Sequence, residues 1–166
     1  MAPAAGCEIT DYVTIYGVED KTSSPGELEQ IAARQNLTAV RTALLDLHKA
    51  LLESERASYE QAFGKIGTSY QFLQLLTTDP WFAWLQPVTQ LIAAIDEALD
   101  GKEPLTATGV RALLDRTKSL LAPTAAGEGF SRHYDEALQR DPDVVFAHAT
   151  TARTMRSAGN DKQKGS

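Results

Sequence analysis

The chain has 166 residues, of which 43% are hydrophobic and 23% charged, and its formal net charge is -6. These are the values of a globular protein, and a chain of this length forms one domain whose core needs no metal or disulfide. The acidic balance argues against a surface that binds nucleic acid or an anionic membrane, because phosphate binding depends on clustered Lys and Arg.

The N-terminal residues 1–23 show no helical period and are expected to form an extended arm. Val13 to Tyr16 are strand formers, but no second strand is predicted to pair with them. The arm carries five large apolar residues, and they are Ile9, Tyr12, Val13, Ile15 and Tyr16. Because such residues avoid water, we expect the arm to lie on the helical domain or to cover a second subunit.

The longest periodic segment, 25–63, is predicted to be a helix that begins at a capping box. Ser24 and Glu27 form the box, and Pro25 suits the first helical position. The segment Asn36-Leu37-Thr38 is a possible break into two helices. Gly64 and Gly67 end the helix, and a short helix follows to Leu76. Apolar residues lie on most sides of this short helix, which predicts deep burial.

Residues 79–101 are the most apolar part of the chain and are predicted to form a central helix. Asp79 and Pro80 mark its start, and Gly101, which tolerates a left-handed conformation, marks its end. Trp81 and Trp84 lie on its apolar stripe. Pro87 falls inside the pattern, so we expect a kink or two helices that meet near residues 85–87.

Three further helices are predicted, at about 106–121, 130–140 and 142–157. Val144, Val145, His148 and Met155 form the inward face of the last of them. Residues 159–166 are polar and are predicted to be a disordered tail. We therefore expect an all-α domain, a bundle of five or six largely up-and-down antiparallel helices at 24–158, preceded by the arm.

A polar seam on the long helix is the first candidate site. His48, Glu55 and Tyr59 follow one side of this helix, and Trp84 of the central helix can complete a pocket beside them. A seam of this kind can line a binding pocket. The favoured explanation is structural, with His48 and Glu55 each bonding to a neighbouring helix or to water at the edge of the core.

The sequence carries no recognised metal or catalytic motif. It lacks Glu-x-x-His and His-Glu-x-x-His, it has no pair of cysteines, and Gly-x-Ser-x-Gly and phosphate-loop patterns are absent. His48, His133 or His148 with Glu55 is an alternative metal site, although a hydrogen-bonded core histidine explains His148 better. We expect no catalytic residue, no cofactor and no metal.

The aromatic residues around Trp81 and Trp84 are the second candidate, because such clusters form either plain core or an interface hot spot. The segments DPWFAWLQP (79–87) and LQRDPDVV (138–145) resemble small all-helical bacterial proteins, a resemblance that implies no activity. The lone Cys7 fits a reducing compartment, so we expect a cytoplasmic protein. Ala4-Ala5-Gly6-Cys7 is preceded by no export signal, and the longest uncharged stretch is too short to span a bilayer.

Two hypotheses about function follow. The first is a non-enzymatic interaction or scaffold protein that forms a homodimer through the Trp81 and Trp84 region or the arm, or binds another protein. The second is a small-molecule or metal binding protein, possibly an enzyme, with a pocket between the long and central helices.

Overall fold

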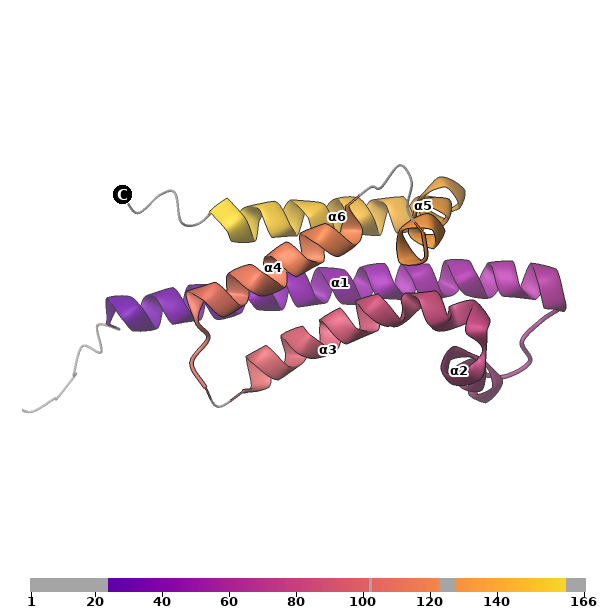
Figure 1. The fold of residues 1–166 in the computed structure, drawn as a ribbon, viewed down its shortest axis with the longest axis horizontal. Helices are drawn as coiled ribbons and strands as arrows, with labels where there is room; N and C mark the ends of the chain where they lie inside the picture. Colours follow the sequence, from indigo (N-terminus) through magenta and orange to yellow (C-terminus); the bar gives the residue numbers. More distant parts are fainter. Residues whose placement is uncertain (1–23, 102, 123–127, 161–166) are drawn as a thin grey trace, which may run out of the picture.

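The structure is a computed structural model that describes residues 24–101, 103–122 and 128–160 (Figure 1). Within these ranges the chain forms six α-helices, one short 3-10 helix and no strand. The predicted all-α class and helix number are confirmed. The predicted arm, 1–23, lies outside the described residues, and so do residues 161–166 of the predicted tail.

The longest helix, α1 (Pro25–Phe63), runs the whole length of the molecule (Figure 1). Its start is fixed by the predicted capping box, in which the Ser24 backbone N–H donates to Glu27 Oε2 at 2.8 Å. The helix does not break at residues 36–38. Leu37 is fully buried there, and its packing in the core stripe holds the backbone helical through the segment.

The predicted central helix is divided as Pro87 indicated. A 3-10 helix, η1 (Pro80–Leu85), leads into α3 (Gln86–Asp100), with Pro87 in the first turn of α3, where no intrahelical N–H bond is lost. The Asp79 side chain accepts a hydrogen bond from the Trp81 N–H at 2.9 Å, so the predicted cap is present. The helix ends at Gly101 as predicted, but the φ of Gly101 is -58°, so the end does not use the left-handed conformation.

The remaining long helices are α4 (Ala107–Leu121) and α6 (Pro142–Asn160), with the shorter α5 (Phe130–Arg140) between them. α6 continues three residues beyond the predicted end at 157, so Gly159 and Asn160 belong to the helix and not to the tail. In Figure 1 the four long helices α1, α3, α4 and α6 alternate in direction, which confirms the up-and-down arrangement.

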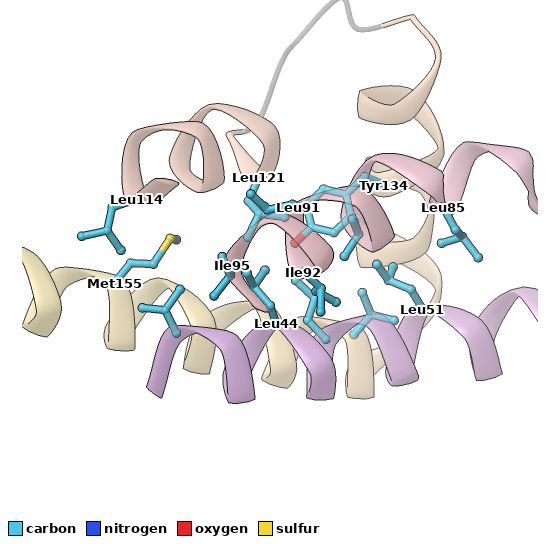
Figure 2. Close-up of a cluster of buried hydrophobic side chains, with 14 of the residues drawn as sticks. Leu44, Leu51, Leu85, Leu91, Ile92, Ile95, Leu114, Leu121, Tyr134 and Met155 are labelled. Atoms are coloured by element: carbon cyan, nitrogen blue, oxygen red, sulfur yellow. The ribbon is translucent and has the colours of Figure 1, made fainter. Parts of the chain in front are cut away.

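The core lies between α1 and the helices that cover it. α1 packs most extensively against α6 and α3, and also contacts η1, α4 and α5. Figure 2 shows side chains from these elements meeting above α1, and the labelled ones are Leu44, Leu51, Leu85, Leu91, Ile92, Ile95, Leu114, Leu121, Tyr134 and Met155. On α6, Val144 is fully buried as predicted, whereas Val145 is exposed because it lies one residue off the inward stripe.

The short helix α2 (Ser69–Thr78) departs most from the prediction. Thr68 caps it through a hydrogen bond from the Gln71 N–H, but none of its residues is buried, and the expected deep burial is wrong. The physical reason is its position. α2 lies beside the last turns of α1, where it packs mainly against η1, so that Phe72 meets Phe82 with ring centroids 5.8 Å apart while the outer side stays uncovered (Figure 1).

Candidate functional site

His48 lies at the contact between α1 and α3. The side chain is half-buried, and its Nε2 is 3.1 Å from the Oγ1 of Thr89 on α3. Burial disfavours the charged imidazolium and lowers the pKa of His48. This histidine thus has a hydrogen-bonding partner on the neighbouring helix, as expected for a polar residue at the edge of a core.

Glu55 belongs to a buried ion pair that ties α5 to α1. The Glu55 side chain is 7% exposed, and its Oε1 accepts a hydrogen bond from Arg140 Nη2 at 2.6 Å. The same guanidinium nitrogen donates to Ser54 Oγ at 3.0 Å. The carboxylate is therefore occupied by a structural partner that comes from 85 residues further along the chain.

Tyr59 lies where α1, η1 and α2 meet. Its hydroxyl donates to Asp79 Oδ2 at 3.4 Å, and its ring lies 5.5 Å from the Phe82 ring and 5.9 Å from the Trp81 ring. Burial, together with the Asp79 carboxylate, raises the pKa of Tyr59. Tyr59 thus contacts Trp81, another of the predicted site residues.

Trp84 and His148 belong to a second aromatic group, between η1, α5 and α6. The buried Trp84 ring stacks on His133 at 5.4 Å and lies 5.6 Å from Phe130. The Tyr134 hydroxyl is 2.7 Å from His148 Nδ1, and burial lowers the pKa of His148. Trp84 is thus covered by side chains of α5, and His148 is a hydrogen-bonded core histidine, as the sequence favoured.

Tyr134 is the residue that sequence reasoning missed. It is 1% exposed, stacks on Phe130 at 5.3 Å, and burial raises its pKa well above the usual range. Its spacing from Phe130, four residues on one helix, indicated that the two rings share a face. No local pattern in the sequence indicated that Tyr134 pairs with His148, because this contact depends on how α5 packs against α6.

An open cleft of about 500 Å³ lies at the end of the molecule where α1 passes into α2. Tyr59 is the only predicted site residue that lines it; His48, Glu55, Trp81, Trp84 and His148 do not. Gly64 ends α1 with a φ of +97°, which turns the chain back along the cleft. The lining residues are Tyr59, Phe63, Gly64, Lys65, Ile66, Gln71, Gln74, Leu75 and Thr78.

The lining of this cleft is a mixture of apolar and polar side chains. Its lining includes no His, Cys, Asp or Glu, and Lys65 is the one charged residue in it. In the part of the chain that the structure describes, no group of three or more His, Cys, Asp and Glu residues is arranged to hold a metal ion. The cleft therefore offers apolar packing surface together with hydrogen-bonding groups of Tyr59, Gln71, Gln74 and Thr78.

Comparison with protein-family models, with curated proteins and with solved structures finds no match for this chain. None of the helices within 24–101, 103–122 and 128–160 is long and apolar enough to cross a bilayer.

Three large apolar side chains are exposed around the cleft end. Phe63 is 66% exposed, Tyr70 69% and Leu73 59%. We call these three residues, together with the cleft, the α1–α2 surface. Trp81 lies directly behind it, with its ring 5.5 Å from the Phe63 ring. The aromatic region that the sequence singled out at Trp81 therefore adjoins this surface, while Trp84 faces α5.

Proposed function

We propose that the protein is a non-enzymatic protein-interaction module that acts as a homodimer, with the α1–α2 surface as the contact. The observation that carries the proposal is the state of α2. Its sequence is apolar on most sides, yet no residue of it is buried within the single chain. Phe72, Leu75 and Leu76 are partly buried against the core, whereas Tyr70 and Leu73 are exposed, so a further surface that covers these two side chains would add stability.

The energy available at this surface is considerable. Full burial of a large apolar side chain contributes about 1.5–3 kcal/mol relative to exposure. Phe63, Tyr70 and Leu73 each keep more than half of their surface exposed, so most of this contribution is available to a partner. Tyrosine is also among the residue types that dominate binding energy at interfaces.

Charge favours a second copy as the partner. The chain carries a formal net charge of -6, so two copies repel each other wherever acidic faces meet. α2 contains no charged residue, and Lys65 is the one charge in the cleft lining. A two-fold contact places the same patch of both copies against itself, and the uncharged α2 helices then meet without the repulsion that acidic faces produce.

Sedimentation velocity of the full chain over a range of concentrations tests the proposal. We expect a dimer, and we expect Leu73→Glu to shift the protein to monomer because it places two carboxylates in the apolar contact. Phe146→Glu is the matched control, since Phe146 is 72% exposed but lies on α6. A monomeric wild type, or a Leu73→Glu protein that dimerises like Phe146→Glu, would overturn the proposal.

The cleft favours one alternative function, the binding of a small apolar molecule. Its volume of about 500 Å³ is within the range of small-molecule sites. A thermal-shift screen with apolar metabolites separates this alternative from dimerisation, because a bound ligand raises the unfolding temperature of the Leu73→Glu monomer as well as that of the wild type. Absence of any shift contradicts the alternative.

A further inference from the structure

The nine arginines of the chain divide into two groups by their place in the fold. The five on α1 and α5 each bond to or pair with an oxygen of another residue, and they are Arg34, Arg41, Arg56, Arg132 and Arg140. The other four are exposed and form no hydrogen bond or ion pair with a described residue, and they are Arg111, Arg116, Arg153 and Arg156. All four lie on α4 and α6, two helices that contact each other (Figure 1).

The helices α4 and α6 are basic within an acidic protein. Together they carry five basic and two acidic residues, a net charge of +3, whereas the whole chain has a formal net charge of -6. At physiological ionic strength, exposed charges that lie further apart than about 8 Å are largely screened from each other. A partner that reaches α4 and α6 therefore meets a positive surface, and the acidic residues elsewhere act on it only weakly.

The outward side of α6 carries an exposed stripe with an apolar half and a basic half. Four exposed residues follow one another at steps of three and four, the spacing of one helix face, and they are Phe146, Ala149, Arg153 and Arg156. Phe146 is 72% exposed, the highest value for a large apolar side chain among the described residues. The buried Val144, Thr151 and Met155 lie on the opposite side of α6 and hold it against the core.

We propose that this α6 stripe is a docking surface for an amphipathic helix of a partner protein, in which apolar residues are followed along one face by Asp or Glu. Helices that pack side by side repeat their contacts at steps of three and four, so such a helix matches the stripe position by position. Its apolar residues cover Phe146 and Ala149, and its carboxylates accept hydrogen bonds from Arg153 and Arg156. A guanidinium group can donate two parallel bonds to one carboxylate, so arginine suits an acidic partner.

Two other occupants fit the α6 stripe less well. A second copy of the chain would bring the arginines of both copies into one contact, and the stripe holds no carboxylate to pair with them. A nucleic acid presents phosphates along its whole length, whereas the positive surface is limited to two helices of a chain with a net charge of -6. The α6 stripe is also separate from the α1–α2 surface, so the inference does not depend on the proposed homodimer.

Fluorescence anisotropy of a labelled synthetic peptide tests the inference with the full-length protein. The peptide is a soluble helix of alanine and glutamine with two Leu and two Glu residues at positions i, i+3, i+7 and i+10, made in both chain orders. In the control peptide Lys replaces Glu. We expect a Glu peptide to bind in one of the two orders and the Lys peptide not to bind.

Variants of the protein locate the binding site. Arg153→Glu/Arg156→Glu should raise the dissociation constant of the Glu peptide about ten-fold or more, because two attractive contacts become repulsive. Phe146→Glu should weaken binding to a similar degree. Lys49→Glu/Arg132→Glu is the matched control, since it reverses two charges on α1 and α5, and it should change the dissociation constant less than about three-fold.

Three results would overturn the inference. They are failure of both Glu peptides to bind, equal losses in the two double variants, and tighter binding of a short DNA duplex than of the Glu peptide. Sedimentation velocity of Arg153→Glu/Arg156→Glu separates the inference from the proposed function. We expect this variant to dimerise like the wild type, and loss of the dimer would instead make the α6 stripe a contact between copies. A monomeric wild type that binds the Glu peptide refutes the homodimer alone.

Discussion

Loss of the Arg140 guanidinium is expected to be the most damaging removal of a single charge in the described structure. In Arg140→Met the long apolar stem is kept, but Glu55 loses its ion-pair partner while remaining buried at 7% side-chain exposure. Ser54 loses the same donor. Among the described residues, Arg140 is the one cation that forms an ion pair with Glu55, so the carboxylate is left without an ion-pair partner in this variant.

The magnitude follows from burial and distance. Two unit charges about 4 Å apart interact by about 4 kcal/mol at the effective dielectric constant of a protein surface. Removing one partner of a buried pair costs about 3–5 kcal/mol. Because the Arg140 side chain is 42% exposed, water already screens part of this attraction. We therefore expect Arg140→Met to lower the free energy of unfolding by about 2–3 kcal/mol.

Urea unfolding followed by circular dichroism measures this change. Arg132→Met is the control, because Arg132 pairs with Glu136 at 3.7 Å with both side chains more than half exposed, and its loss should cost less than about 0.5 kcal/mol. In the double variant Glu55→Met/Arg140→Met the buried charge is gone, so much of the stability should return. A loss below about 1 kcal/mol in Arg140→Met, or no recovery in the double variant, refutes the reasoning.

Two further predictions concern the buried polar residues. Tyr134→Phe removes the hydroxyl that lies 2.7 Å from His148 Nδ1 and should lower the free energy of unfolding by about 1 kcal/mol in the same urea assay, whereas no loss would contradict a structural role for this bond. Burial lowers the pKa of His48 and His148, so both stay neutral in the folded state while the unfolded chain takes up protons below about pH 6.5. Their contribution to stability is complete above that pH and is lost as the pH falls toward the folded pKa values. The unfolding temperature should therefore drop between pH 7.5 and 5.5, and the variant His48→Gln/His148→Gln should show a smaller drop; an equal drop would assign the effect to other groups.

Local signals in the sequence predicted the helices and most of their ends. Ser24 and Asp79 cap helices because their side chains accept backbone hydrogen bonds, and Pro87 divides the central segment because it lacks an N–H. These effects act within one turn of helix and need no knowledge of the fold. Gly101 shows the limit, since glycine permits a left-handed end without requiring it.

The arrangement of the site depended on tertiary contacts that no local signal carries. His48, Glu55 and Tyr59 do follow one another along α1, but their partners Thr89, Arg140 and Asp79 arrive on three different elements. The three residues that the sequence placed along one pocket therefore form three separate hydrogen bonds in the structure.

The error at α2 has a related origin. Hydrophobicity on most sides of α2 predicted deep burial, but whether a helix is covered depends on where the chain places it. α2 stands beside the last turns of α1, mainly against η1, and the other helices leave its outer side open. The same mismatch between composition and burial supports the proposed contact at the α1–α2 surface.

The contact between α1 and α6 has a consequence for how the chain folds. These helices, the first and the last described, form the most extensive pairing in the molecule, and Thr151 Oγ1 donates to the Ala43 carbonyl oxygen at 3.1 Å across it. During synthesis α1 emerges from the ribosome well before α6 is made. The apolar residues of α1 that pack against α6 therefore stay uncovered until about a hundred further residues have been added. Folding of this bundle to the native state is thus delayed until α6 has been synthesised, and nascent chains that stop before residue 142 are expected to be targets for chaperones and proteases.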